Sequence, residues 1–286
     1  NILVESRAKP ISDVPKMILG NKPSDGGNLI LDEREKELIL IEEPFLEKYI
    51  HLYIGTEEYI NSKRRYCFWL TDLIPSDLAR SKELKSRLNN VREFRLKSTA
   101  QPTRLKAETP HIFFYISQPK GNYLIVPSTS SENRKYIPIG FLSPNVIASN
   151  ACTIVPNATL YHFGILTSSV HNAWMRVVAG RHEMRYRYSG SVVYNNFVWA
   201  DATDEQKEKI SKTAQAILDA RNLYSNTSLA ELYSQNGLSI ATELYTAHKA
   251  NDKAVLALYG FNADATEDEI VAKLMQMYAE KVKESL

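Results

Sequence analysis

The sequence of 286 residues lacks several features that would assign a protein class at once. It has only two cysteines, Cys67 and Cys152, and neither belongs to a Cys-x-x-Cys pair or a Cys/His cluster. A disulfide framework and a zinc site are therefore excluded, and we expect two buried thiols in a protein of the reducing cytoplasm. No run of 18 apolar residues is present, so no membrane partner is expected.

Patterns that bind phosphate or metal are missing as well. The glycine pair Gly26–Gly27 stands in NKPSDGGNLIL without a GxGxxG or GxxxxGK[ST] pattern, so it is interpreted as a turn. His162, His171 and His182 do not have the spacing of metal ligands, so we expect no metal. The acidic residues of 32–47 are interpreted as a solvated helix face, because nuclease carboxylates must converge on a metal from strands.

Charge is nearly balanced in total but unevenly distributed along the chain. Residues 201–286 hold 14 acidic and 9 basic residues, which leaves 19 acidic and 26 basic residues in 1–200. The first part therefore carries a net charge of +7 and the last part −5. A polyanionic partner is expected to contact the first part.

Hydrophobic periodicity predicts an α+β protein, with a mixed-sheet first part and an all-α last part. Two capping boxes, Thr203 with Gln206 and Thr266 with Glu269, mark helix starts in the last part. Strands are predicted within 48–73, 111–117, 122–128, 136–142 and 148–156. Helices are predicted at 32–47, 75–98, 204–223, 227–235, 239–259 and 266–285.

The stretch SSVHNAWMRVVAGRHEMRYRYSGSVVYNNF, residues 168–197, changes its period in the middle. It begins as a helix and breaks at Gly180, after which its residues alternate. In a strand, this alternation places Glu183, Arg185 and Arg187 on one side of a sheet. A carboxylate and two guanidiniums that point the same way suit the pattern of base edges in a DNA major groove. A solvated strand face with cross-strand salt bridges is the alternative.

The densest group of basic residues lies in a predicted helix. Arg92 and Arg95 are expected to share a helix face, and Lys97 follows them. Contact with DNA phosphates is one interpretation of this group, and a solvated amphipathic face is the other. Arg176 and Arg181 flank the alternating strand and are further candidates for phosphate contacts.

Several longer motifs occur in order along the whole chain. They are ILVESRAKPISDVP, NKPSDGGNLIL, RRYCFWL, VREFRL, QPKGNYLIVP, SSENRKYIPIGFL, HFGILTSSVHNAWMRVVAGRHEMRYRYSGSVVYNNF, DARNLY and HKANDKAVLALYGF. Through these motifs the chain resembles the MmeI-like (type IIL) restriction–modification enzymes, in the part that follows the adenine methyltransferase domain. The resemblance implies the end of the methyltransferase domain in 1–20, a target recognition domain in 21–200 and a helical C-terminal domain in 201–286.

The resemblance implies a bifunctional parent protein. Such enzymes combine a nuclease domain with an S-adenosylmethionine-dependent DNA adenine-N6 methyltransferase domain, followed by the domain that selects the sequence. Adenine methylation needs an Asn/Asp-Pro-Pro-Tyr/Phe loop for the flipped base, and Tyr194-Asn-Asn-Phe197 lacks both prolines. We therefore expect no catalytic or cofactor-binding residue in this fragment. S-adenosylmethionine belongs to the upstream methyltransferase domain, and that domain and double-stranded DNA are the expected partners.

Base choice within the family is associated with a few positions. Arginine donates to guanine O6 and N7 and glutamate accepts from cytosine N4, so Glu183 and Arg185 suit one C·G pair. The resemblance places that pair just after the methylated adenine. The position near Ser128 often carries a larger residue in the family. The implied readout residues are Asn150, Ala151, Glu183, Arg185, Arg187 and Ser128.

Two other functions stay open on the sequence. One is a stand-alone DNA-binding specificity subunit that works with separate catalytic chains, and an Asn-Pro-Pro-Tyr motif upstream in the same gene would exclude it. The other is a protein-interaction module whose basic face stabilises the fold, and specific duplex binding in a gel shift would exclude that one.

Overall fold

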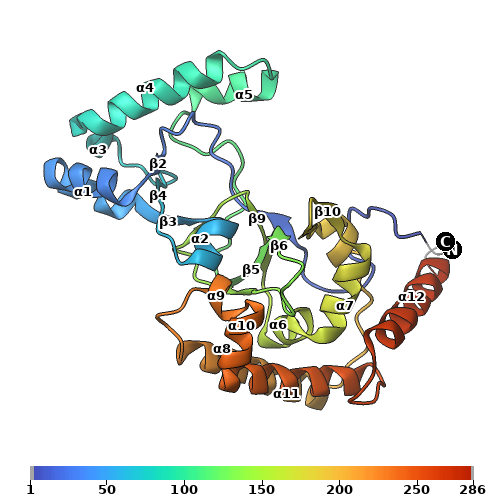
Figure 1. The fold of residues 1–286 in the computed structure, drawn as a ribbon. Coiled ribbons are helices and arrows are strands. Elements are labelled where there is room, and N and C mark those ends of the chain that lie inside the picture. Colours follow the sequence, from blue (N-terminus) through green and yellow to red (C-terminus); the bar gives the residue numbers. More distant parts are fainter. Residues whose placement is uncertain (1–2, 285–286) are drawn as a thin grey trace. The chain divides into compact units, whose positions relative to one another are not determined.

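The structure, a computed structural model, describes residues 3–284 and divides the chain into two compact units. Unit 1 consists of residues 1–18, 121–142 and 153–286, and unit 2 consists of 19–120 and 143–152. The helices beyond residue 201 belong to the same compact unit as 121–142. The predicted α+β class, with sheets in the first part and helices in the last, is confirmed (Figure 1).

Unit 2 is built on a four-stranded sheet of order β2-β4-β3-β8. Strand β3 is antiparallel to β4 and parallel to β8. Its strands are β2 (Ile30–Leu31), β3 (Ile50–Ile54), β4 (Tyr66–Phe68) and β8 (Ile147–Ala148). Its helices are α1 (Glu33–Glu42), the 3-10 turn η1 (Pro44–Tyr49), α2 (Thr56–Asn61), α3 (Pro75–Arg80), α4 (Lys82–Leu96), α5 (Gln101–Leu105) and the 3-10 turn η2 (Lys106–Glu108).

Local signals explain where the predicted helices of unit 2 divide. The helix predicted at 32–47 ends at Glu42, because Pro44 disfavours helical backbone in the residue before it and starts a 3-10 turn. The helix predicted at 75–98 is broken at Ser81, whose hydroxyl accepts from the Leu84 N–H at 3.0 Å and caps α4. The strand predicted at 111–117 is wrong, since only an isolated bridge between Lys22 and Tyr115 forms there.

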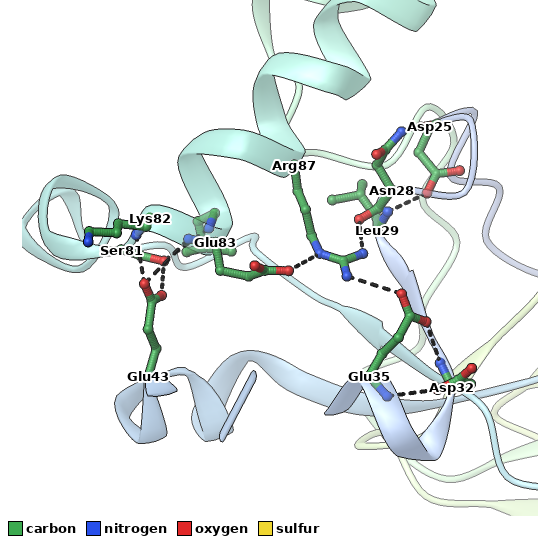
Figure 2. A network of polar contacts seen from close by, with 11 residues as sticks. Asp25, Asn28, Leu29, Asp32, Glu35, Glu43, Ser81, Lys82, Glu83 and Arg87 are labelled. Carbon is green, nitrogen blue, oxygen red and sulfur yellow. Dashed lines mark hydrogen bonds and ion pairs between the residues drawn. The ribbon is translucent and has the colours of Figure 1, made fainter. Parts of the chain in front are cut away.

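Polar contacts join α1 to α4 in unit 2 (Figure 2). Arg87 donates through Nε to Glu83 at 2.5 Å, and through its two Nη atoms to the Asn28 carbonyl at 2.9 Å and to Glu35 at 3.2 Å. Glu43 accepts from the Lys82 N–H at 2.7 Å, at the start of α4. The carboxylates of this acidic region thus cap α4 and pair with Arg87, in addition to forming the solvated helix face that the sequence predicts.

Unit 1 carries two sheets and most of the helices. The sheet orders are β1-β9-β5-β7 and β10-β11-β6. The strands are β1 (Ile18–Leu19), β5 (Tyr123–Pro127), β6 (Thr129–Ser130), β7 (Gly140–Leu142), β9 (Cys152–Pro156), β10 (Gly180–His182) and β11 (Arg185–Arg187). The helices are α6 (Leu160–Thr167), α7 (Ser169–Val178), the π-helical turn η3 (Gly190–Tyr194), α8 (Asp204–Asn222), α9 (Leu229–Leu232), α10 (Gln235–Ile240), α11 (Thr242–Leu258) and α12 (Glu267–Glu284).

The core of unit 1 lies around α6 and α7, and α6 packs against α8 while α7 packs against α12 (Figure 1). Gly164 lets α6 approach α8, because a Cβ there would meet Ile210 Cγ2 at 2.6 Å. The Asn251 amide on α11 donates to the Gly164 carbonyl at 2.8 Å. Trp174 is buried in this core and donates to the Val193 carbonyl at 2.9 Å.

Two sequence-based exclusions concern membranes and metals. Among residues 3–284, no helix is both long enough and apolar enough to cross a bilayer. Within the same residues, no three His, Cys, Asp or Glu side chains are grouped so that they could hold a metal ion.

Candidate nucleic-acid interface

A β-hairpin follows directly after α7 in unit 1. Strands β10 and β11 are antiparallel, with His182 opposite Arg185 and a two-residue loop of Glu183 and Met184 between them. Glu183 has a φ of +55°, as the primed turns of two-residue hairpin loops require at their first position. The single strand predicted for this stretch is therefore wrong, because the chain reverses at Glu183.

The hairpin separates the three predicted reading residues. Arg185 and Arg187 lie on the exposed side of β11, while Tyr186 between them is 7% exposed and points inward. Their predicted common side is confirmed. Glu183 is not on that strand face but at the exposed tip of the hairpin, two residues before Arg185.

Strand β6 brings Ser128 next to the hairpin. Arg187 pairs with Thr129 in β6, and the Tyr188 N–H donates to the Ser128 carbonyl at 2.9 Å. Ser128 thus lies beside the end of the strand that carries Arg187. The structure brings these two predicted readout positions together within unit 1.

Buried tyrosine and histidine side chains support the hairpin from α7. Tyr188 is 4% exposed, and its hydroxyl lies 2.7 Å from Nε2 of His171. Burial lowers the pKa of His171 to about 3 and raises the pKa of Tyr188 well above its usual value. His171 was excluded as a metal ligand by its spacing, and nothing in the sequence indicates this supporting role.

Asn150 and Ala151 form the exposed tip of a turn between β8 and β9 in unit 2. The Asn150 N–H donates to the Asn21 carbonyl at 3.0 Å, and the Thr56 hydroxyl donates to the Ala151 carbonyl at 2.7 Å. The backbone of this turn is thus fixed while the Asn150 side chain remains exposed. Such an arrangement suits a side chain that must present an amide to a ligand.

Glycine and buried amide side chains allow this close packing. A Cβ on Gly20 would lie 2.1 Å from the Ser149 carbonyl oxygen, and one on Gly55 would lie 2.7 Å from the Ser149 hydroxyl. Asn21 is fully buried, and its amide donates to the Ala148 carbonyl at 2.8 Å and to Gln118 at 2.9 Å. No local signal in the sequence indicates these supporting residues, because they are far from the turn in the chain.

Arg95 does not fit its predicted role. It is fully buried, and all five of its N–H groups donate to backbone carbonyls. Its guanidinium is therefore not available to a phosphate. The prediction that Arg92 and Arg95 share an exposed helix face is wrong, because Arg95 is buried and only Arg92 is exposed. The five acceptors are the carbonyls of Pro23, Ser24, Lys106, Thr109 and Ile112, at 2.8–3.0 Å.

The other predicted phosphate contacts fall into two groups. Arg92 and Lys97 are exposed on unit 2, and Arg92 is only 3.9 Å from Glu108. Arg181 is exposed and stacks on Tyr186, with its guanidinium carbon 3.8 Å from the ring centroid. Arg176 is instead engaged by Glu267 through two hydrogen bonds of 2.8 and 3.0 Å, so its phosphate role is also corrected.

Known proteins resemble this chain over nearly its whole length. The family model for the MmeI target recognition domain matches residues 1–201, and the model for the MmeI C-terminal domain matches residues 202–286. DNA methyltransferase A of Bacillus subtilis (strain 168) is 37% identical over 284 residues, which are 98% of this chain and 32% of that protein.

A solved structure matches the fold. The type IIL restriction-modification enzyme MmeI, in complex with DNA, superposes with a TM-score of 0.94 and 45% identity over 99% of this chain and 38% of that one. The chain thus spans about a third of the length of both relatives.

Proposed function

Because this chain belongs to the MmeI family, as target recognition domain followed by C-terminal domain, we propose that it selects the DNA sequence for a restriction–modification methyltransferase. The proposal includes a parent that transfers a methyl group from S-adenosylmethionine to adenine N6, in a methyltransferase domain outside this chain. The division into residues 1–20, 21–200 and 201–286 belongs to the same proposal. The cofactor and the reacting groups are assigned to the upstream domain, and this chain supplies the choice of site.

The hairpin is the observation that carries this proposal. Arg185 and Arg187 project from one side of a strand whose inner residue, Tyr186, is anchored in the core. A two-stranded ribbon fits into the major groove of B-DNA, and a guanidinium can donate to both O6 and N7 of guanine. The anchored layer beneath the strand holds the two arginines in place, which reduces the entropy lost on binding.

Glu183 and Arg185 are proposed to read one C·G pair. They occupy the first loop position and the first strand residue after the loop, so both lie at the tip that enters a groove first. A carboxylate at this tip accepts from cytosine N4 and rejects the acceptor-only edge of guanine. Asn150 at the tip of its own turn, with Ala151, is proposed as a separate base contact, and Ser128 as a small residue that leaves room beside Arg187.

Phosphate contacts are proposed for the exposed cations that have no strong carboxylate partner. These are Arg92 and Lys97 on unit 2 and Arg181 beside the hairpin. Such contacts orient the protein on the duplex without choosing a sequence.

A charge exchange at the hairpin tip tests the proposed function. The complete gene product with Glu183→Lys and Arg185→Asp is expressed, and methylated adenines in the host DNA are located by single-molecule sequencing. We expect the base after the modified adenine to change from C to another base, because donor and acceptor have exchanged places. An unchanged C at that position would refute the assignment.

A matched control exchanges an exposed ion pair elsewhere in unit 1. Glu208→Lys with Lys212→Glu reverses a pair on α8 that is 2.9 Å long. The control variant and the tip variant both keep the net charge of the wild type. The control should therefore methylate the original sequence.

A further inference from the structure

A hollow of about 400 Å³ in unit 1 is not used by the proposed reading of bases. Its lining comes from α7, α11, the first turn of α12 and the loop before β7. Figure 1 shows α7 between α11 and the hairpin strand β10. The charged side chains of its lining are Lys135, Arg176, Lys249, Asp252, Lys253 and Glu267.

The two carboxylates of the hollow are already engaged. Asp252 is 2% exposed and accepts from the Tyr136 hydroxyl at 2.6 Å and from the Ser169 N–H at 2.8 Å. Glu267 forms the two-fold hydrogen bond with Arg176. Neither carboxylate therefore forms an ion pair with a lysine of the rim.

The three lysines form a rim whose positive charge is only partly offset, because the buried Asp252 carboxylate attracts Lys135 and Lys249 without forming an ion pair with either. Lys135, Lys249 and Lys253 are exposed, and none has a carboxylate within 4.0 Å among residues 3–284. Lys249 and Lys253 are one helical turn apart on α11, where two like charges repel each other. An anion bound between them would relieve that repulsion.

Arg176 fixes the loop that supplies the third lysine. Its Nη1 donates to the Lys135 carbonyl at 3.2 Å while Glu267 holds the rest of its guanidinium. The arginine that the sequence indicates as a phosphate contact thus supports the rim from behind. Lys135 Nζ lies over the rings of Tyr245 and Tyr136, 5.2 and 5.9 Å from their centroids, and the side chains of all three lysines are exposed.

We propose that this lysine rim binds a backbone phosphate of the same duplex whose bases the hairpin reads. The inference rests on the proposed function and adds a second contact area to it. The lysine ammonium is a compact charge with three rotatable donors, so it binds phosphate oxygens from many directions. A rim of three lysines can therefore follow a backbone without selecting a sequence.

The distance from the hairpin fits one duplex. Arg181 of β10 lies 3.9 Å from Glu132, and Lys135 follows Glu132 by three positions. Three residues span at most about 11 Å, whereas one turn of DNA is about 34 Å long. Lys135 of the rim thus lies within one turn of a duplex that receives the hairpin.

The test measures the salt dependence of DNA affinity for the complete gene product. Wild type and the Lys249→Gln, Lys253→Gln double variant are titrated with a duplex that contains the methylation site, at several salt concentrations. Each lost phosphate contact reduces the slope of log K against log salt by about 0.9. We expect a slope smaller by about 1.8 and an affinity lower by up to roughly 60-fold at 0.1 M salt, with the same site preference.

Two further variants make the result decisive. Lys249→Arg with Lys253→Arg keeps both charges and should restore the slope. Lys209→Gln with Lys283→Gln removes two exposed lysines from α8 and α12 and should keep the wild-type slope. Melting curves show whether each variant is folded.

Three outcomes would overturn the inference. One is a wild-type slope in the folded Gln variant, and another is an equal loss in the Lys209 and Lys283 control. The third is that inorganic phosphate raises the melting temperature of wild type but not of the Gln variant while DNA affinity is unchanged, which would assign the rim to a small phosphate ligand. If wild type shows no preference for its site at all, the proposed function itself has failed.

Discussion

Nε2 of His171 lies 2.7 Å from the hydroxyl of Tyr188, and both side chains are buried beneath the hairpin strand β11. This contact connects α7 to the residue that directly follows β11, the strand that carries Arg185 and Arg187. The hairpin is therefore held by the core of unit 1 and not only by its own short ladder. Such an anchor is consistent with a part that must present side chains at fixed positions.

The first prediction concerns the pH dependence of stability. Burial holds the pKa of His171 at about 3 in the folded chain, while an unfolded histidine has a pKa near 6.5. Stability is thus fully present above about pH 6.5 and decreases as the pH falls towards 3, by up to about 1.4 kcal/mol per unit. His171→Gln removes this titration, so its unfolding free energy should fall less steeply between pH 6 and 4.

Urea unfolding at several pH values measures this effect. His182→Gln removes an exposed histidine from the hairpin and serves as the control. His248, whose pKa burial also lowers, keeps part of the acid sensitivity in both variants. Equal slopes for wild type and His171→Gln would contradict the prediction.

The second prediction separates stability from base choice at Glu183. A residue other than glycine at a φ of +55° is strained by about 1 kcal/mol, and glycine relieves the strain at an entropic cost of similar size. Glu183→Gly should therefore change the melting temperature by less than about 3 °C. The same variant should lose its preference for C after the modified adenine, as sequencing of methylated sites would show.

Loss of folding together with loss of preference would contradict this separation. Glu183→Gln keeps the side-chain length and replaces an acceptor by an amide. It should relax the preference more weakly than Glu183→Gly does, because an amide oxygen still accepts from cytosine N4.

The third prediction concerns Arg95. Arg95→Met removes five hydrogen-bond donors from backbone carbonyls that converge on one buried guanidinium. Buried acceptors without partners cost about 1–3 kcal/mol each, and some will find water. We expect a loss of at least about 3 kcal/mol in chemical denaturation, whereas Arg92→Met, on the exposed face, should change stability by less than about 0.5 kcal/mol.

DNA binding by folded Arg95→Met provides a second check. Its salt slope should equal that of wild type, because the guanidinium reaches no phosphate. A slope reduced by one contact would reinstate the original prediction for this residue.

The fourth prediction concerns the support of the Asn150 turn. A Cβ at residue 55 would meet the Ser149 hydroxyl at 2.7 Å and the Ala151 Cβ at 3.2 Å. Gly55→Ala should therefore displace the turn and weaken discrimination at the base that Asn150 contacts, by about tenfold or more. Gly121→Ala, where a Cβ meets nothing within 4 Å, is the matched control.

Competition between duplexes that differ at single positions measures this discrimination. A uniform loss of affinity at all positions would mean that the turn contributes to folding alone. A loss confined to one base pair supports the assignment of Asn150.

The patterns of the sequence predict the local architecture well where a signal lies within a few residues. The capping boxes at Thr203 and Thr266 lie at the starts of α8 and α12. The helix ends before Gly180, and Arg185 and Arg187 share one side of a strand, both as predicted. Each of these depends on backbone hydrogen bonds or strand geometry that neighbouring residues determine.

Contacts between segments that are distant in the chain determine the features that the sequence did not predict. The turn at Glu183 pairs β10 with β11 locally, but the position of β11 beside β6 joins segments that are more than 50 residues apart in the chain. Arg95 and Arg176 have the sequence context of surface cations, yet one is surrounded by five carbonyls and the other is paired with Glu267. No periodicity reveals such partners, because it reports which face of an element is apolar and not what that face meets.

By itself the sequence determined the α+β class, the family and the segments that hold the positions proposed to read bases, because these depend on composition, local spacing and recognisable motifs. Only the tertiary structure decided which charged side chains are free to bind. A guanidinium is available to DNA when no nearer acceptor satisfies its donors, and the acceptors of Arg95 and Arg176 come from other parts of the chain. The same physical rule leaves Arg185 and Arg187 on the exposed side of the hairpin and leaves three lysines around the hollow of unit 1.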